Sequence, residues 1–210
     1  MVATSMISIL NYGLGNVSAF ERSLQRSNIP YQLASTPSDL RSASKIIFPG
    51  VGSFDQTINL LRDKDLFDPL NTLVTQFQIP ILGICVGMQV MGSSSTEGNL
   101  PGFGWVDGIV EQLHPSTPEF PLPHIGWNTI NSSLSLSSNK VTNSEYYFLH
   151  SYGFLELSPK FNPCFTTYVN NFVASFSYNN IFGVQFHPEK SHVSGQLLIK
   201  NFCLESSLSL

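Results

Sequence analysis

The chain has 210 residues, of which 42% are hydrophobic and 11% charged, and its formal net charge is −4. This length fits one domain over residues 1–210, and the composition excludes a disordered chain. The absence of a Lys/Arg cluster argues against nucleic acid as a partner, and no apolar run approaches the about 20 residues of a membrane span. We expect a cytoplasmic protein without a membrane partner, in which residues 1–5 form a disordered extension and Met6 is a second candidate initiator.

Short apolar runs alternate with helical patterns through the first half of the chain. The pattern predicts strands over residues 7–10, 31–34, 45–48 and 81–84, and helices over residues 17–27, 37–43, 55–61, 68–77 and 86–91. Such alternation indicates a parallel sheet covered by helices on both faces.

The second half is richer in aromatic and β-branched residues. It predicts mostly antiparallel strands over residues 105–113, 146–150, 165–168, 172–178 and 181–186. The serine-rich segment 131–139 is typical of a surface loop, and a final helix over 194–204 is expected to pack Leu197, Leu198 and Phe202 against the sheet. The predicted fold class is α/β: an open, mostly parallel sheet flanked by helices, with antiparallel additions in the second half.

Cys85 is the first candidate for chemistry. It stands between Gly83 and Gly87, after a buried strand and before a helix, and this spacing is the thiol counterpart of a nucleophile elbow. A helix N-terminus also stabilises a thiolate relative to a thiol. A buried cysteine is commonly only a packing residue, but the strand, the glycines and the helix together favour a nucleophile. The other two cysteines, Cys164 and Cys203, leave an odd number that is too small for a disulfide framework.

His187 and Glu189 follow the last apolar strand. In an extended segment residues two apart share a face, and Pro188 is expected to keep this segment out of a helix. A carboxylate beside an imidazole fixes its tautomer and stabilises its charged form, so with a thiol the pair gives nucleophile, base and orienting group. A histidine at a strand end that serves only the structure remains the alternative unless Cys85 lies beside it.

The turn at residues 49–52 also ends a predicted parallel strand. Its glycines allow main-chain N–H groups to point at an oxyanion, although an ordinary β–α turn has the same composition. Ligands of open α/β sheets bind at the carboxyl ends of the strands, where all three of these motifs fall. We expect no metal or organic cofactor, because His114, His124 and His150 lack the spacing of a metal site.

Six motifs together resemble the class I glutamine amidotransferases, in chain order from about residue 6 to 204. Within that family the chain is most similar to the glutaminase subunits of imidazole-glycerol-phosphate synthases. The motifs are NYGLGN at 11–16, PGVG at 49–52, GICVGMQ at 83–89, PHIGWN at 123–128, YFLHSY at 147–152 and QFHPEKS at 185–191.

The resemblance implies a glutaminase that passes ammonia to a synthase/cyclase partner in a heterodimer that makes imidazole glycerol phosphate and AICAR. It implies that Cys85 attacks the glutamine amide, that His187 moves the proton and that Glu189 holds His187. The backbone N–H groups of Val51 and Val86 are the implied oxyanion hole. The same resemblance implies that the substrate is bound by Gly50, Gly52, Gln89, Glu97, Ser151 and Tyr152. It also implies that the partner interface and the ammonia exit involve Asn16, His124, Trp127 and Lys190.

Two departures leave the ammonia acceptor open. Many glutaminases of histidine biosynthesis have leucine where this chain has Val86, and residues 91–105 and 148–152 are similar to a paralogous group encoded with surface-polysaccharide genes. The alternative is therefore the same chemistry feeding a sugar amidotransferase. A cysteine hydrolase of other specificity and a non-catalytic binding protein are further alternatives, although the latter usually lacks a triad residue.

Overall fold

The computed structural model describes residues 6–113, 119–130 and 144–205. Residues 1–5, the serine-rich segment 131–139 and His114 lie outside the described residues, so the expectations for them are untested. The described chain is built around a sheet of seven strands. From one edge to the other these are β10 (Cys164–Thr167), β11 (Asn171–Tyr178), β12 (Ile181–Val184), β4 (Ile81–Cys85), β3 (Lys45–Gly50), β1 (Ile7–Leu10) and β2 (Tyr31–Ala34).

The sheet is parallel from β12 to β2 and antiparallel from β10 to β12. In this register Val184 lies beside Ile84, and Gly50 lies beside Cys85. The carboxyl ends of β3, β4 and β12 therefore meet at one edge of the sheet. This confirms the predicted fold class, including the antiparallel addition from the second half.

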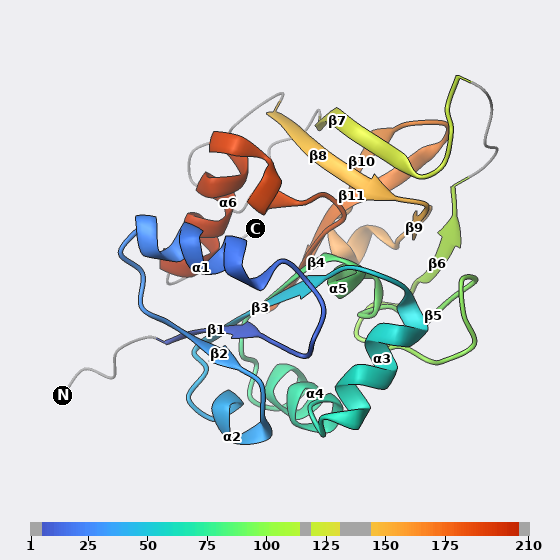
Figure 1. Ribbon diagram of the computed structural model, residues 1–210. Helices are drawn as coiled ribbons and strands as arrows, with labels where there is room; N and C mark the ends of the chain where they lie inside the picture. Colours follow the sequence, from blue (N-terminus) through green and yellow to red (C-terminus); the bar gives the residue numbers. More distant parts are fainter. Residues whose placement is uncertain (1–5, 114–118, 131–143, 206–210) are drawn as a thin grey trace.

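Helices cover both faces of the sheet, with α1 and α6 on one side and α3 and α4 on the other (Figure 1). The helices are α1 (Val17–Arg26), α2 (Pro37–Leu40), α3 (Phe54–Asp63), α4 (Phe67–Thr75), α5 (Val86–Gln89) and α6 (His192–Leu204), and the 3₁₀ turns are η1 (Pro159–Phe161) and η2 (Pro188–Lys190). On α1 the buried side chains are Phe20 and Leu24, as the amphipathic pattern predicts. On α6 the expectation for Leu197 is wrong, because this side chain is 41% exposed while Leu198 and Phe202 are buried.

Two small sheets flank the carboxyl edge of the main sheet. One contains β5 (Ser94–Ser95), β6 (Ile109–Gln112) and β9 (Tyr152–Phe154), and the other pairs β7 (His124–Ile130) with β8 (Ser144–His150). The sequence patterns did not indicate β5, β7 or β9. They also placed a strand over residues 105–108, where the chain instead bends before β6.

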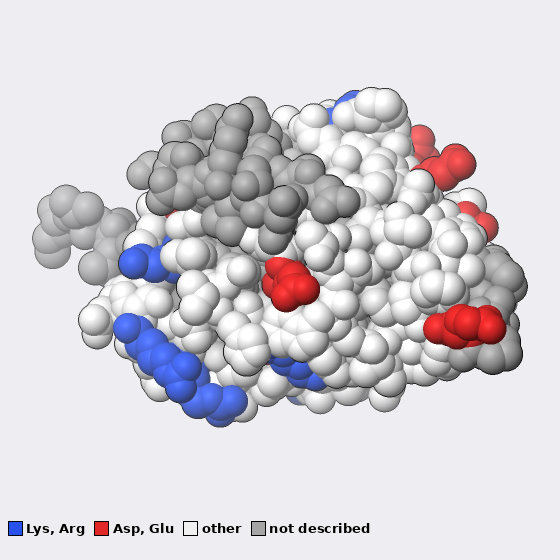
Figure 2. Space-filling view, turned by 90° about the horizontal axis from the view of Figure 1, so that it is seen from above, with Lys and Arg blue, Asp and Glu red and all other residues white. Residues whose placement is uncertain are grey.

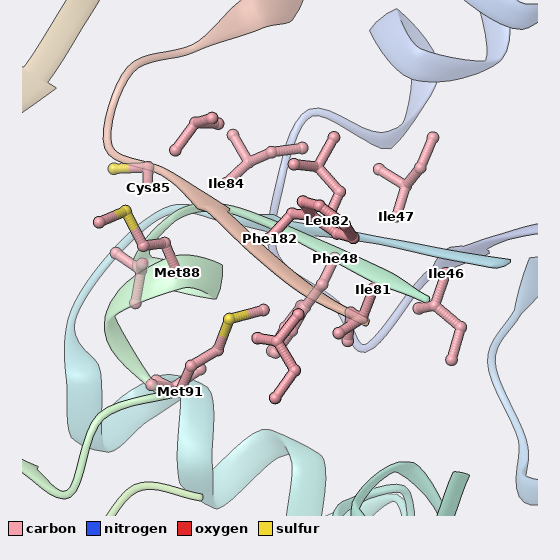
Figure 3. Packing of buried hydrophobic residues seen from close by; sticks show 14 of the residues in the cluster. Ile46, Ile47, Phe48, Ile81, Leu82, Ile84, Cys85, Met88, Met91 and Phe182 are labelled. Atoms are coloured by element: carbon pink, nitrogen blue, oxygen red, sulfur yellow. The ribbon is translucent and has the colours of Figure 1, made fainter. Parts of the chain in front are cut away.

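The core is continuous across the central strands. Figure 3 shows side chains packed on both sides of β3 and β4, with Ile47 and Ile84 above the strands in that view and Met88 and Met91 below. Strands buried on both faces are typical of a parallel sheet with helices on either side, and they explain the unbroken apolar runs in the sequence. The core thus fixes the strand ends that carry the candidate motifs.

Charged side chains are sparse on the outside of the molecule. Figure 2 shows only a few of them on a largely uncharged face, as expected when only 11% of all residues are charged. Within the described ranges, none of the helices has the length and apolar character needed to cross a membrane.

Candidate active site

Cys85 occupies a strained turn between β4 and α5. Its backbone has φ 54° and ψ −113°, and it caps the N-terminus of α5. A side chain with this sparsely populated pair of positive φ and negative ψ costs about 1–3 kcal/mol, and the surrounding structure must hold it there. The sharp turn directs the thiol away from the sheet core and toward the strand edge, which confirms the elbow that the glycine spacing predicts.

Three glycines pack the turn so tightly that no side chain fits at any of them. A Cβ atom on Gly87 would lie 2.2 Å from the carbonyl oxygen of Phe48, and one on Gly50 would lie 2.1 Å from the backbone nitrogen of Gly87. A Cβ atom on Gly83 would lie 2.6 Å from the carbonyl oxygen of Gly87. Backbone therefore rests on backbone between β3 and the elbow, and this contact locks the position of Cys85.

His187 and Glu189 form a buried pair beside Cys85. The His187 Nδ1 and Glu189 Oε1 atoms are 2.9 Å apart, and each side chain is only 2% exposed. The backbone differs from the prediction: residues 188–190 form the 3₁₀ turn η2 rather than an extended segment. Proline's fixed φ suits the first position of a helical turn, so Pro188 starts the turn instead of preventing it.

The environment of His187 favours its protonated form. Burial on its own lowers the pKa of His187, but hydrogen bonds and charge attraction from Cys85 and Glu189 outweigh it and raise the pKa to about 10. With Nδ1 engaged by Glu189, Nε2 is the nitrogen left for the thiol. His187 can therefore accept the thiol proton and hold it at neutral pH.

Backbone hydrogen bonds fix the segment that carries this base. The His187 N–H donates to the Tyr147 carbonyl at 2.8 Å, which ties the end of the main sheet to β8. The buried Ser191 hydroxyl donates to the His187 carbonyl at 2.6 Å and accepts from the Tyr147 N–H at 3.0 Å. The base is thus positioned by polar contacts, to which Ser191 contributes two.

The sulfur and the imidazole face a cavity of about 240 Å³. Most of the side chains and backbone groups that the resemblance assigned to chemistry or binding line it. The lining comprises Val51, Gly52, Cys85, Val86, Gln89, Glu97, Pro123, Leu149, His150, Ser151, Tyr152 and His187. Gly50 does not line the cavity. It packs on the backbone of Gly87 and supports the turn that carries Cys85.

The two expected oxyanion residues come from neighbouring strand ends. Val51 follows β3 and Val86 begins α5, and both line the cavity next to Cys85. The Tyr12 hydroxyl donates to the Pro49 carbonyl at 3.0 Å and anchors the segment before Val51. Tyr12 is fully buried, and this burial raises the pKa of its hydroxyl. Tyr12 therefore stays a neutral donor at any ordinary pH.

The polar residues expected to bind substrate have defined partners. The Glu97 Oε2 atom accepts from the Phe54 N–H at the N-terminus of α3, at 2.8 Å. The Gln89 Nε2 atom donates to the Tyr152 carbonyl at 2.7 Å and to Gln185 Oε1 at 3.1 Å. These bonds hold a carboxylate and an amide in place on the cavity wall.

The four residues expected at a partner interface differ in how far they are exposed. Trp127 is 44% exposed and stacks on His192, and Lys190 is exposed above the Tyr147 ring. Asn16 is half-buried at the start of α1. His124 differs, because it is 3% exposed and lies between Tyr168 and Phe148.

His124 and His150 form a buried pair, a contact that the sequence did not predict. The His124 Nδ1 and His150 Nε2 atoms are 3.4 Å apart, and His150 Nδ1 lies 2.9 Å from the Tyr152 carbonyl. Burial lowers the pKa of His124 to about 4 and that of His150 to about 3. Both rings are neutral at physiological pH. In the part of the chain that the structure describes, no cluster of three or more His, Cys, Asp or Glu side chains could hold a metal ion.

Gln185 is the site residue that sequence reasoning missed. It is fully buried and its amide nitrogen lies 3.6 Å from the sulfur of Cys85. Gln185 stands two residues before His187, so the alternation that paired His187 with Glu189 would have placed Gln185 on the same side. Glutamine does not ionise and is therefore not a usual candidate for acid–base chemistry, but its spacing from His187 is visible in the sequence.

Comparisons with known proteins agree with this geometry. Residues 9–206 match the family model "Glutamine amidotransferase class-I". The chain is 44% identical over 202 residues to the imidazole glycerol phosphate synthase subunit HisH of Leptospira borgpetersenii, and 42% identical over 201 residues to that of Bdellovibrio bacteriovorus. Each alignment covers 94% of this chain and 98% of the relative.

Solved structures show the same fold at lower sequence similarity. One, titled "Crystal structure of glutamine amidotransferase", has a TM-score of 0.71 at 15% identity and covers 93% of this chain and 98% of that one. A second, PurLQS from Thermotoga maritima, has a TM-score of 0.71 at 15% identity and covers 95% of this chain and 97% of that one. By the family match over residues 9–206, this chain belongs to the class I glutamine amidotransferases.

Proposed function

We propose that this protein is the glutaminase subunit of an imidazole glycerol phosphate synthase. It hydrolyses glutamine to glutamate and ammonia in the cytoplasm and supplies the ammonia to a synthase/cyclase partner in histidine biosynthesis. The curated relatives at 44% and 42% identity carry this subunit's name and match over nearly their whole length. One observation carries the chemistry: Cys85 and the His187–Glu189 pair meet at one cavity from the ends of adjacent parallel strands.

The first step forms a thioester. The His187 imidazole takes the proton from the Cys85 thiol, and the sulfur forms a bond to the side-chain amide carbon of glutamine. The C–N bond then breaks, the amide nitrogen receives the proton held by His187, and ammonia leaves. Because Glu189 stabilises the imidazolium, the proton can stay on His187 between these two events.

Hydrolysis of the thioester completes the cycle. His187 deprotonates a water molecule, the oxygen adds to the thioester carbon, and the C–S bond breaks with its electron pair on the sulfur. Each addition makes an oxyanion, for which the backbone N–H groups of Val51 and Val86 are the assigned donors. The Glu97 carboxylate and the backbone around Ser151 and Tyr152 would hold the ends of the amino acid, with Gln89 and Gly52 beside them.

The partner is assigned to the face carried by β7. Ile125 and Trp127 project from this strand with 58% and 44% of their surfaces exposed, and Val193 at the start of α6 is 69% exposed. Large apolar side chains gathered in this way are typical of a protein interface. The cavity-lining Pro123 directly precedes β7, so ammonia released at the cavity has a short way to a partner seated here. Lys190 and Asn16 would lie at its rim.

The test is glutamate release from glutamine by the purified chain, alone and mixed with a histidine-pathway cyclase subunit and its nucleotide ligand. We expect release that the liganded cyclase stimulates and that Cys85→Ala abolishes. Cys164→Ser is the matched control, because Cys164 lies on β10 outside the cavity lining, and it should keep full activity.

Other results would favour a different partner, a different nucleophile or a different substrate. Cys85-dependent release that the cyclase leaves unchanged would move the assignment to the sugar amidotransferase partner. Release that persists in Cys85→Ala would contradict the triad. Turnover of an ester or peptide while glutamine is ignored, even with the partner present, would favour a hydrolase of other specificity.

A further inference from the structure

Gln185 lies directly beside the nucleophile. It follows the last residue of β12, and its N–H extends the pairing with β11 by donating to the Ala174 carbonyl at 2.8 Å. Because Val184 is the register partner of Ile84, the next residue along each strand is Gln185 on one and Cys85 on the other. The side chain is fully buried, so it is not in contact with solvent.

The amide of Gln185 has a defined orientation. Its Oε1 atom accepts from the Nε2 atom of Gln89 at 3.1 Å, and Gln89 is itself fixed by the Tyr152 carbonyl at 2.7 Å. With its oxygen engaged on that side, the amide presents its Nε2 atom to the sulfur of Cys85 at 3.6 Å. Burying an amide without hydrogen-bond partners costs free energy. In Gln185 both the oxygen and the nitrogen of the amide have a partner.

The two protonation states of Cys85 have different partners. As a neutral thiol, Cys85 can donate to the Leu149 carbonyl, 3.8 Å from the sulfur. As a thiolate it is only an acceptor, and the Gln185 N–H and the His187 imidazolium are the donors that face it. A hydrogen bond to an ionised acceptor is markedly stronger than one to a neutral thiol, so the Gln185 contact favours the thiolate.

We infer that Gln185 stabilises the thiolate of Cys85, both before attack and when the sulfur leaves the thioester. This role rests on the proposed function, in which Cys85 is the nucleophile. In thioester hydrolysis the electron pair of the C–S bond returns to the sulfur, and the Gln185 N–H meets the charge that develops there. Gln185 thereby acts on both half-reactions without touching the glutamine carbonyl.

Alkylation of Cys85 by iodoacetamide tests the inference without any substrate. The rate is measured from about pH 5 to about pH 10 on the peptide that contains Cys85, because only the thiolate reacts. Gln185→Met keeps the length of the side chain without the N–H, and Gln185→Asn keeps an amide one methylene too short to reach. In both variants the midpoint of the pH profile should rise by about one unit, a tenfold loss of thiolate at a fixed lower pH.

Two controls separate this effect from simple destabilisation. The buried Cys203 reports unfolding, and it should stay protected in every variant used. Asn180→Leu removes a structural amide that bonds the Val74 and Ile79 carbonyls at the other end of the β11–β12 hairpin. It should lower stability and leave the Cys85 profile unchanged.

The alkylation experiment tests the role of Gln185 separately from the proposed function. An unchanged midpoint in both folded variants would overturn the inference and leave Gln185 a packing residue. A raised midpoint in either folded variant, with Asn180→Leu unchanged, supports it. In the assembled enzyme the same variants should lower kcat for glutamine about tenfold with KM within twofold. Absence of wild-type glutaminase activity would contradict the proposed function but would not alter the alkylation result.

Discussion

β4 and β12 lie side by side, yet they hold the two halves of the site by different means. On β4 the position of Cys85 is set by shape, because backbone packs on backbone at Gly50 and Gly87. Beyond β12 the position of His187 is set by a hydrogen bond from its ring to the Glu189 carboxylate and by one from the Ser191 hydroxyl to its carbonyl. The nucleophile should therefore be sensitive to added volume, and the base to lost charge and changes in pH.

The largest expected effect comes from one methyl group on the β4 side. In Gly87→Ala the new Cβ atom would lie 2.2 Å from the Phe48 carbonyl oxygen, so β3 and the elbow must separate. We expect a loss of about 3 kcal/mol or more in the free energy of unfolding, measured by urea denaturation, and no glutamate release.

Gly104→Ala is the matched control for that clash. Gly104 has φ +66° and open space around its Cα atom, so alanine there meets only backbone strain. It should cost about 1 kcal/mol and leave glutamate release intact. Equal losses of stability in the two variants would contradict the idea that shape holds the elbow.

On the β12 side, removing charge should reduce activity without loss of structure. Glu189→Gln keeps an oxygen that accepts from His187 Nδ1 but removes the charge that stabilises the imidazolium. We expect glutamate release to fall by about 100-fold or more, with the fold retained and the unfolding midpoint lowered, because the stabilised imidazolium also contributes to stability. The pKa of His187, followed by NMR, should fall from its value of about 10.

An unaltered pKa of His187 in this variant would show that Glu189 does not govern the base. Glu119→Gln provides the comparison, because Glu119 is an exposed carboxylate outside the cavity lining. Its replacement should change neither the rate nor the pKa of His187.

The buried histidine pair adds a dependence of stability on pH. The pKa values of His124 and His150 are lowered to about 4 and about 3, so below about pH 6.5 the unfolded chain binds protons that the folded chain does not. The free energy of unfolding should therefore fall with decreasing pH, by at most about 1.4 kcal/mol per pH unit for each histidine.

His124→Phe sharpens this point because it keeps a ring stacked on Phe148 and Tyr168 and removes one titrating group. Between about pH 6.5 and about pH 4.5, the free energy of unfolding, measured by urea denaturation, should depend less steeply on pH than in the wild type. The slope should be smaller by at most about 1.4 kcal/mol per pH unit. Identical slopes in the wild type and the variant would rule out a neutral, buried His124.

The smallest expected effect is the loss of one hydroxyl. Ser191→Ala leaves the Tyr147 N–H without its acceptor and should cost about 1–2 kcal/mol, with a several-fold fall in glutamate release. Ser44→Ala removes a hydroxyl bond to the Met6 carbonyl at the opposite end of the sheet, and it should cost similar stability without changing the rate. A rate unchanged in both variants would remove Ser191 from the support of His187.

The sequence predicted well where local pattern and tertiary structure agree. The segments Ile7–Leu10 and Tyr31–Ala34 both form strands with the expected bounds. The first is buried along its whole length, whereas the second is the edge strand of the sheet and is mostly half-buried or exposed. The convergence of Cys85 with His187 was only a hypothesis, since it depends on the pairing of β4 with β12 across 100 residues of chain.

Other features depend on contacts that no local pattern records. β7 alternates Gly126, Asn128 and exposed apolar residues, so it does not have the composition of a typical strand, and it forms through pairing with β8. The helical turn after Pro188 and the burial of His124 likewise depend on neighbouring elements. The resemblance placed residues on a site, but it did not give their exposure.

The strand order also has a consequence for biosynthesis. β12 is the neighbour of β4 on the side away from β3, and it is among the last elements to leave the ribosome. Until it arrives, the finished elbow lies on an edge strand with Ile81 and Leu82 exposed to pairing with other chains. An interrupted chain that ends before residue 181 would therefore carry a thiol without its base, and it would be prone to aggregate rather than to consume glutamine.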